Sequence, residues 1–252
     1  MKEFKRDKLN VKIYKDRDEM GNAAARDIAA AIEEMLKSKD ELNVIFAAAP
    51  SQNEVLRALK DDKSIKWERV NAYHMDEYVG LTPDAPQGFG NFLRDRLFSL
   101  VPLKSVNYID ASASSPDGEA ERYGALIDKN KPDIVVMGIG ENGHIAFNDP
   151  GVADFNDKKT AKPVALDDIC RTQQVNDGCF EKLSDVPTSA ITLTVPTLFC
   201  AEKLFCIVPA PTKAKAVART VNGTISESCP ATILRRHACA TLYLEPESAK
   251  LL

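Results

Sequence analysis

The stretch DIVVMGI, residues 133 to 139, is almost entirely apolar and ends at glycines. A short apolar run with such a boundary is typical of a strand buried on both faces, as in a parallel sheet. Helical and strand patterns alternate on both sides of this stretch. This alternation predicts an α/β fold, a single doubly wound and mostly parallel sheet with helices on both faces, with residues 1–252 in a single domain.

The remaining elements follow from residue composition and periodicity. Segments rich in alanine, leucine and charged residues predict helices, and shorter apolar runs predict strands. The expected helices are 17–39, 50–60, 87–100, 117–130 and 212–221, and the expected strands are 41–49, 69–75, 133–139, 189–195, 203–210 and 240–245. Residues 150–188 carry few regular signals, so we expect a long active-site loop there with a short helix.

The composition excludes several classes of protein. Hydrophobic residues make up 44% and charged residues 28%, which is ordinary for a soluble globular protein, and the net charge of −4 gives no general attraction to nucleic acid. The apolar runs are far shorter than the roughly 20 residues that span a bilayer. No signal peptide is evident, and the six cysteines include no CxxC pair. We therefore expect a cytoplasmic protein with reduced cysteines, no metal, and neither nucleic acid nor membrane as a partner.

Four segments lie just after predicted strand ends. They are AAAPSQN (47–53), HMDEYVG (74–80), GIGENGHIAFNDP (138–150) and PAPTKA (209–214). In open α/β sheets, ligands bind beyond the carboxyl ends of the strands. The four segments are therefore expected to converge on one cleft.

Two of these segments carry candidates for proton transfer. Asp76 and Glu77 follow an apolar strand, so at least one carboxylate is expected to point into the cleft with a raised pKa, although both could be solvated acids or helix caps. His144 lies near Asn142 and Asp149, and either could orient its ring through one nitrogen while the other nitrogen faces a ligand. This arrangement predicts a carboxylate base and a separately oriented imidazole.

The other two segments, with the glycine-rich loop, predict a site for an anion. Lys213 lies at the start of a predicted helix, where backbone N–H groups and an ammonium group together suit a phosphate, although it could be a surface lysine. Ser51 and Gln52 could add donors to the same anion, or Ser51 could simply cap its helix. Three glycines of the central loop would allow a ligand to approach the backbone closely, and they are Gly138, Gly140 and Gly143.

In order and spacing, MDEYVGL (75–81), GIGENGHIAFNDP (138–150), DVPTSAITLTVPTL (185–198) and PTKAKAV (211–217) resemble the glucosamine-6-phosphate deaminase/isomerase family. The resemblance implies a Rossmann-like fold of the sugar-phosphate isomerase/deaminase type. It also implies a cofactor-free reaction in which a hexosamine phosphate and water give a ketose phosphate and ammonium. By analogy, His144 would open the sugar ring, Asp76 would carry a proton between C2 and C1, and Lys213 would bind the phosphate.

The sequence departs from this family at several positions. Asn142 stands where many members have aspartate, and it could still orient the histidine ring through its amide oxygen. Asp149 replaces a longer glutamate, so its contact to His144 is expected to need a water molecule or a shifted loop. AAAPSQN replaces a glycine-rich phosphate loop, and Arg171 does not fall cleanly on the position of a phosphate-binding arginine. These changes indicate a divergent subgroup that acts on glucosamine-6-phosphate or on another hexosamine phosphate, and Arg171 is kept as a candidate for substrate binding.

Two other functions remain open from the sequence. A 6-phosphogluconolactonase-like hydrolase would use the same fold, but the MDEYVGL and AFNDP motifs favour deamination. A non-catalytic sugar-phosphate sensor would normally need a DNA-binding module, and no basic recognition helix is evident in the first 40 or so residues. The expected partner is a small sugar phosphate, with a homo-oligomer possible.

Overall fold

The predicted central strand, β7 (Ile134–Met137), lies in the middle of a large sheet in the computed structural model, which describes residues 1–252. Seven strands of this sheet run parallel, and β1 alone is antiparallel to its neighbour. In spatial order the strands are β1 (Lys2–Arg6), β2 (Leu9–Ile13), β11 (Ala240–Leu244), β10 (Lys203–Val208), β7, β3 (Leu42–Phe46), β4 (Val70–His74) and β6 (Ser105–Asn107). The predicted α/β class with a mostly parallel sheet is confirmed.

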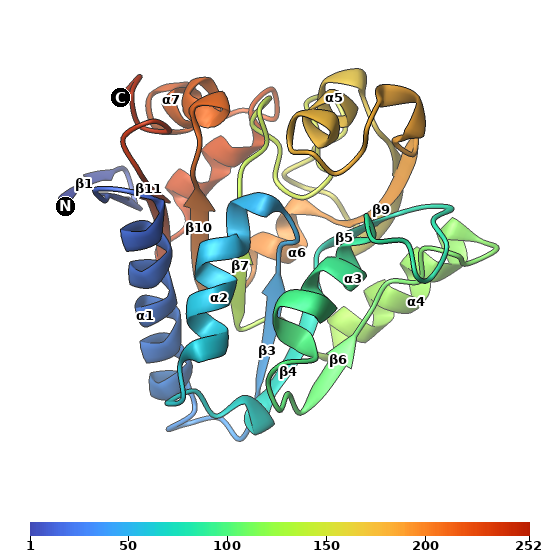
Figure 1. The fold of residues 1–252 in the computed structure, drawn as a ribbon, viewed down its shortest axis with the longest axis horizontal. Coiled ribbons are helices and arrows are strands. Elements are labelled where there is room, and N and C mark those ends of the chain that lie inside the picture. Colours follow the sequence, from blue (N-terminus) through green and yellow to red (C-terminus); the bar gives the residue numbers. More distant parts are fainter.

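Helices cover both faces of this sheet (Figure 1). The helices are α1 (Arg17–Met35), α2 (Asn53–Asp61), α3 (Phe89–Leu93), α4 (Pro116–Lys129), α5 (Asp168–Asn176), α6 (Val195–Phe199) and α7 (Ala214–Asn222). The short helical turns are η1 (Pro50–Gln52), η2 (Trp67–Arg69), η3 (Arg94–Phe98), η4 (Leu183–Asp185), η5 (Pro211–Lys213) and η6 (Pro230–Arg236). Asp16 caps α1 by accepting a hydrogen bond from the backbone N–H of Glu19, which fixes where this long helix begins.

The strand side chains alternate between two apolar cores, as the pleat of a strand requires. In β7, Ile134 and Val136 pack on the face covered by α1, α2 and α3, whereas Val135 and Met137 pack on the face covered by α4, α6 and α7. Both faces of the strand are therefore buried. This explains why the sequence of β7 is continuously apolar instead of alternating between apolar and polar residues.

The N-terminal hairpin of β1 and β2 was not predicted. Its sequence is dominated by charged residues, and β1 lies at the edge of the sheet with most of its side chains exposed. Asp7 takes the positive φ of 51° that the turn between the strands requires. Backbone pairing with β11 and the burial of Leu9 and Val11, which alternate with polar residues in β2, hold the hairpin on the sheet.

A second, three-stranded antiparallel sheet lies beside the first, in the order β5 (Asp76–Tyr78), β9 (Ser189–Leu193) and β8 (Ala161–Ala165). The prediction of a long loop over residues 150–188 is wrong in part, because this segment contains β8 as well as α5. The segment 189–195 is a strand, as predicted, only as far as Leu193. Its partners lie in the small sheet, and α5 lies above the carboxyl ends of the main strands (Figure 1).

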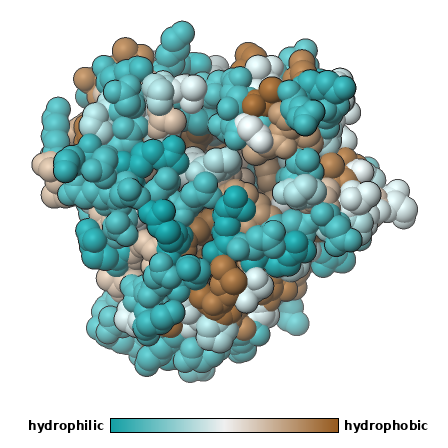
Figure 2. Space-filling model, viewed as in Figure 1, coloured by the Kyte–Doolittle hydropathy of each residue, from teal (hydrophilic) through white to brown (hydrophobic).

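The face of the molecule seen in Figure 2 is mainly hydrophilic, with hydrophobic residues in scattered patches. No helix combines the length with the apolar composition needed to cross a membrane.

Candidate active site

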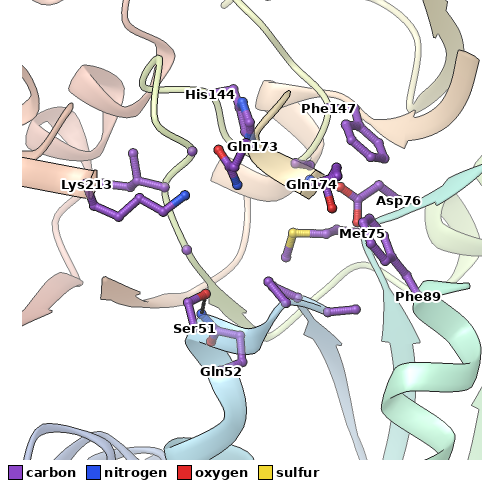
Figure 3. Close-up of a pocket in the computed structure, with 17 residues that line it drawn as sticks. Ser51, Gln52, Met75, Asp76, Phe89, His144, Phe147, Gln173, Gln174 and Lys213 are labelled. Atoms are coloured by element: carbon purple, nitrogen blue, oxygen red, sulfur yellow. Dashed lines mark hydrogen bonds between the residues drawn. The ribbon is translucent and has the colours of Figure 1, made fainter. Parts of the chain in front are cut away.

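A pocket lies at the carboxyl edge of the main sheet, where β3, β4, β7 and β10 end (Figure 3). Because these four strands are parallel and adjacent, the loops that follow them meet at the same edge. The pocket is lined by Ala47, Ala48, Ala49, Ser51, Gln52, Met75, Asp76, Phe89, Gly138, Ile139, Gly140, His144, Ala146, Phe147, Gln173, Gln174 and Lys213. All four segments singled out in the sequence contribute to this lining, and Asp76 and His144 face the same hollow.

The imidazole of His144 is held beside a buried carboxylate. Its Nδ1 atom lies 2.9 Å from Oδ1 of Asp149, although the ring is turned so that the N–H does not point straight at the oxygen. Of the two expectations for this shorter side chain, the need for a bridging water molecule is wrong, because the two side chains are in direct contact. Burial raises the pKa of Asp149, but His144 and Asn142 more than offset this and the pKa is lowered, so the carboxylate stays ionised.

Asn142 acts on the loop and on Asp149, and not on the ring of His144 as expected. Its amide nitrogen donates to Oδ1 of Asp149 at 2.8 Å, and its amide oxygen accepts from the backbone N–H of His144 at 2.9 Å. Neither Asn142 nor Asp149 lines the pocket. They fix the ring from behind, with one nitrogen toward Asp149 and the ring edge toward the pocket.

Cys170 completes this buried cluster. His144, Asp149 and Cys170 place a nitrogen, an oxygen and a sulfur atom within 4.8 Å of one another, and they form the group that could hold a metal ion. Burial and then the charge of Asp149 raise the pKa of the Cys170 thiol, so the thiol keeps its proton. A metal ion would have to displace that proton and separate the side chain of Asp149 from that of His144. The arrangement suits orientation of the imidazole better than metal binding.

Asp76 is the first residue of β5 and its carboxylate makes no hydrogen bond within the protein, among the apolar side chains of Met75, Phe89 and Phe147 (Figure 3). It is 6% exposed, and burial, followed by the charge of Glu77, raises its pKa well above the ordinary value. Such a carboxylate can take up and return a proton near neutral pH.

His74, which sequence reasoning overlooked, fixes the backbone at Asp76. Its Nε2 atom accepts the backbone N–H of Ile109 at 2.9 Å, which leaves the ring proton on Nδ1, 2.9 Å from the carbonyl oxygen of Asp76. Burial lowers the pKa of His74 to about 4, so the ring is neutral. The only sign in the sequence was its place at the end of a predicted strand, two residues before the acid.

Glu77 points away from the pocket, so its predicted contact with substrate is wrong. Its carboxylate accepts backbone N–H groups from Tyr78 at 2.9 Å, Phe89 at 3.0 Å and Gly90 at 2.8 Å. Burial raises the pKa of Glu77, and these three hydrogen bonds lower it in part. Glu77 therefore ties β5 to the start of α3, and through this link it supports the position of Asp76.

We expect Glu77→Gln to lower the free energy of unfolding by about 1–3 kcal/mol, because an amide group cannot accept all three N–H groups as well as a carboxylate can. Urea denaturation followed by circular dichroism measures this change. An unchanged midpoint would show that the three hydrogen bonds contribute little to stability.

The ammonium group of Lys213 enters the pocket from η5, just before α7 (Figure 3). The residue is 4% exposed and forms no ion pair with any carboxylate of the protein. Burial lowers the pKa of Lys213, while Asp177 and Glu141 oppose that shift. A buried and unpaired cation that faces a cavity is a site for an anionic ligand group.

The loop after β3 places Ser51 and Gln52 at the pocket wall. The amide nitrogen of Gln52 donates to the backbone oxygen of Ile207 at 3.2 Å and to the hydroxyl of Ser51 at 3.1 Å. Gln52 is fully buried and joins this loop to β10. The main contacts of Gln52 are therefore within the protein, whereas Ser51 presents its hydroxyl group to the pocket.

Two of the predicted glycines are required by close approach or by backbone conformation. A Cβ atom on Gly140 would lie 2.1 Å from Cε1 of His144, so the imidazole packs directly on this residue. Gly143 has a φ of 93°, and its Cβ would lie 2.5 Å from Sγ of Cys229. Gly138 and Gly140 line the pocket, whereas Gly143 shapes the loop from outside it.

We expect Gly140→Ala to reduce any activity that depends on His144 by about 100-fold, because the added methyl group pushes the His144 ring from its place. Gly124→Ala in α4 is a matched control, since its Cβ would meet no atom closer than 3.5 Å. Steady-state rates and thermal unfolding of both variants make the comparison. Equal rates in the two variants would show that activity does not depend on the exact position of the His144 ring.

Arg171 does not reach the pocket, so its predicted role in substrate binding is wrong. Its guanidinium donates to the backbone oxygens of Leu183 at 2.8 Å and Val186 at 3.0 Å and pairs with Asp168 at 3.1 Å. The same helix instead turns Gln173 and Gln174 inward. Helical spacing puts neighbours in sequence on different faces, so only the register of α5 decided which side chain enters.

Comparison with known proteins gives a consistent picture. The family described as glucosamine-6-phosphate isomerases/6-phosphogluconolactonase matches residues 15–243. A glucosamine-6-phosphate deaminase of Exiguobacterium sibiricum is 36% identical over 220 residues, which cover 87% of this chain and 85% of the relative. Another, of Bacillus thuringiensis, is 32% identical over 244 residues, which cover 96% of this chain and 89% of the relative.

Solved structures are similar over almost the whole chain. A monomeric glucosamine-6-phosphate deaminase has a TM-score of 0.87 at 27% identity, covering 96% of this chain and 99% of that chain. A 6-phosphogluconolactonase from Thermotoga maritima has a TM-score of 0.76 at 19% identity, covering 94% of this chain and 100% of that chain. The second likeness concerns the fold alone.

Proposed function

Because the chain belongs to the glucosamine-6-phosphate isomerase/6-phosphogluconolactonase family, we propose that it is an amino-sugar phosphate deaminase/isomerase. It converts glucosamine-6-phosphate, or a related hexosamine phosphate, and water into fructose-6-phosphate, or the related ketose phosphate, and ammonium. The observation that carries this proposal is the unpaired, buried carboxylate of Asp76 in the same pocket as His144 and Lys213. A proton carrier, an oriented imidazole and a cation suit this chemistry.

His144 opens the pyranose ring. The imidazole edge that faces the pocket gives a proton to the ring oxygen as the C1–O5 bond breaks, and the neutral imidazole then takes up the proton of the C1 hydroxyl as the aldehyde forms. Asp149 stabilises the imidazolium form and holds the ring in place. Asn142 and the thiol of Cys170 keep that carboxylate fixed.

Asp76 carries out the isomerisation. Its carboxylate removes the proton from C2 of the open-chain aldehyde and returns it to C1, while a proton passes from the ammonium group on C2 to O1. C1 becomes a hydroxymethyl group and C2 becomes an iminium carbon. Water adds to this carbon, and the C–N bond breaks to release ammonium and leave the ketone. These steps require acids and bases only, so no metal or organic cofactor takes part.

Lys213 anchors the substrate through its phosphate group. The ammonium group lacks any partner in the protein, and the hydroxyl of Ser51 lines the same pocket. A phosphate dianion would neutralise the buried charge and accept both donors. The alanines of the loop after β3 leave the backbone less free than glycines would, which favours a single phosphate position.

The test is a panel of hexosamine phosphates and 6-phosphogluconolactone, with ammonium and acid release measured on the same preparation. We expect ammonium from at least one hexosamine phosphate and no acid release above the spontaneous rate from the lactone. Acid release without ammonium would make the protein a lactonase. Tight binding of hexosamine phosphate with no turnover would make it a sensor.

We further propose that the enzyme acts in the cytoplasm and that residues 1–252 form one catalytic domain. All six cysteines are free thiols, three of them buried, which fits a reducing compartment. Asp76, His144 and Lys213 all belong to the pocket of a single chain, so the proposed reaction does not depend on assembly into a homo-oligomer.

A further inference from the structure

Gln174 lies in the pocket with a carboxamide that makes no hydrogen bond to any other residue of the protein. The residue is 6% exposed and lines the cavity near Met75, Phe147 and Asp76, and no hydrogen bond joins its carboxamide to any of them. The carboxamide faces the pocket and is not enclosed in the packed interior, so its donor and its acceptor are both open to a ligand. The side chain is therefore suited to a ligand that supplies the missing partners.

The helix that carries Gln174 is fixed against the catalytic loop. The neighbouring Gln173 accepts the backbone N–H of Glu141 at 2.8 Å and donates to Asp177 at 3.3 Å. The first turn of α5 is capped by Asp167, which accepts from the backbone N–H of Cys170 at 2.6 Å. These contacts hold the carboxamide of Gln174 at the pocket.

The position of Gln174 relative to the charged groups indicates which part of a ligand it meets. Figure 3 shows Lys213 entering from one side of the pocket, with Asp76 and Gln174 on the other. A sugar phosphate held by its phosphate at Lys213 and by C1 and C2 at Asp76 must carry its remaining carbons between these points. Because Gln174 lies beside Asp76, it is close to C1 and C2 and to the secondary hydroxyl groups that follow them along the sugar, at C3 and C4. The groups at C1 and C2 are changed in the reaction, whereas these hydroxyl groups are left free to pair with the carboxamide.

We propose that Gln174 determines substrate specificity by hydrogen bonding to a secondary hydroxyl of the sugar, at C3 or C4. A carboxamide offers both a donor and an acceptor, and so does a hydroxyl group, which makes the pair complementary. An epimer or a deoxy sugar leaves the carboxamide buried and unpaired, which reduces kcat/KM by about 10- to 100-fold. This inference rests on the proposed function and names the part of the substrate that the pocket recognises.

The experiment compares Gln174→Met, which keeps the length of the side chain but cannot pair with a hydroxyl, with Thr172→Ala, at an exposed position of the same helix. The substrates are glucosamine-6-phosphate, its C4 epimer galactosamine-6-phosphate, and a 3-deoxy analogue. For the protein with Gln174, we expect kcat/KM for one analogue to be about 10- to 100-fold lower than kcat/KM for the better substrate. Gln174→Met should bring the ratio of the two kcat/KM values close to one by lowering kcat/KM for the better substrate. Thr172→Ala should leave this ratio unchanged. Ratios that are equal in all three proteins would overturn the inference.

A binding measurement separates failure of this inference from failure of the proposed function. Aminoglucitol-6-phosphate, an open-chain polyol that cannot isomerise, and inorganic phosphate serve as probes in calorimetry. We expect Gln174→Met to weaken binding of the polyol phosphate by about 10-fold or more while leaving inorganic phosphate unchanged. Absence of ammonium release from every amino sugar would reject the deaminase function alone. Unchanged affinity for the polyol phosphate would reject the role of Gln174.

Discussion

Asp76→Asn is expected to lower kcat by about 100-fold or more, a usual scale for the loss of a general base. The amide has nearly the same shape as the carboxylate but cannot take up the proton from C2. Substrate affinity should change much less, because phosphate binding at Lys213 and ring binding at His144 are untouched. Ammonium release at saturating substrate measures the first quantity, and calorimetry with a non-reactive polyol phosphate measures the second.

The pH profile gives an independent check on Asp76. Burial and then Glu77 raise its pKa in the free enzyme, so kcat/KM should rise with pH along an acid limb that lies above the ordinary aspartate value of about 3.9. The residual activity of Asp76→Asn should lack this limb. A variant that keeps both the wild-type rate and the wild-type acid limb would show that another group carries the proton.

The stability of Asp76→Asn shows whether its loss of activity comes from the missing base or from a disturbed fold. A carboxyl group whose pKa is raised by folding binds more protons in the folded state, so its contribution to stability is full below the unfolded-state pKa and declines as pH rises through the folded-state pKa. At neutral pH the wild-type protein therefore bears the cost of a buried charge that asparagine removes. Thermal unfolding at pH 7 should give Asp76→Asn a midpoint equal to or higher than that of the wild type.

Lys213→Ala should raise the KM for phosphorylated sugars by about 10- to 100-fold, as expected for the loss of a charged hydrogen bond to phosphate. Turnover of unphosphorylated glucosamine should change little. Lys215→Ala is the matched control, since Lys215 lies two residues further along and is exposed. Equal losses on phosphorylated and unphosphorylated sugars would remove the phosphate role from Lys213.

The unpaired state of Lys213 also predicts how this variant folds. Its ammonium group is buried without a carboxylate partner, and burial lowers its pKa, so removal of the charge costs the fold little. We expect the unfolding midpoint of Lys213→Ala to match that of wild type without ligand. Addition of inorganic phosphate should stabilise the wild type more than the variant, because only the wild type gains an ion pair.

Much of the site could be predicted because it depends on topology. The continuous apolar runs of β3, β7 and β10 indicated parallel strands buried on both faces, and the carboxyl ends of such strands lie along one edge. The loops with Asp76, His144 and Lys213 therefore had to meet. The resemblance to a known family added the proposed roles of these three residues.

Local orientation could not be predicted, because it depends on pairing that the sequence does not display. Asp76 and Glu77 are adjacent in β5, and successive side chains of a strand point to opposite sides. Which of the two would face the pocket was decided by the pairing of β5 with β9, in a sheet that sequence reasoning missed. Likewise, the register of α5 placed Arg171 against backbone carbonyls and turned Gln174 inward.

The sequence by itself determined the layers of the fold, the edge at which the pocket forms, and the loops that supply its charged groups. Hydrophobic periodicity carries this information, because it records which faces are buried. The tertiary structure alone decided the direction of each side chain at that edge, from the carboxylate beside His144 to the unpaired carboxamide of Gln174. Those directions come from long-range contacts among α5, the small sheet and the main sheet, and no local pattern encodes them.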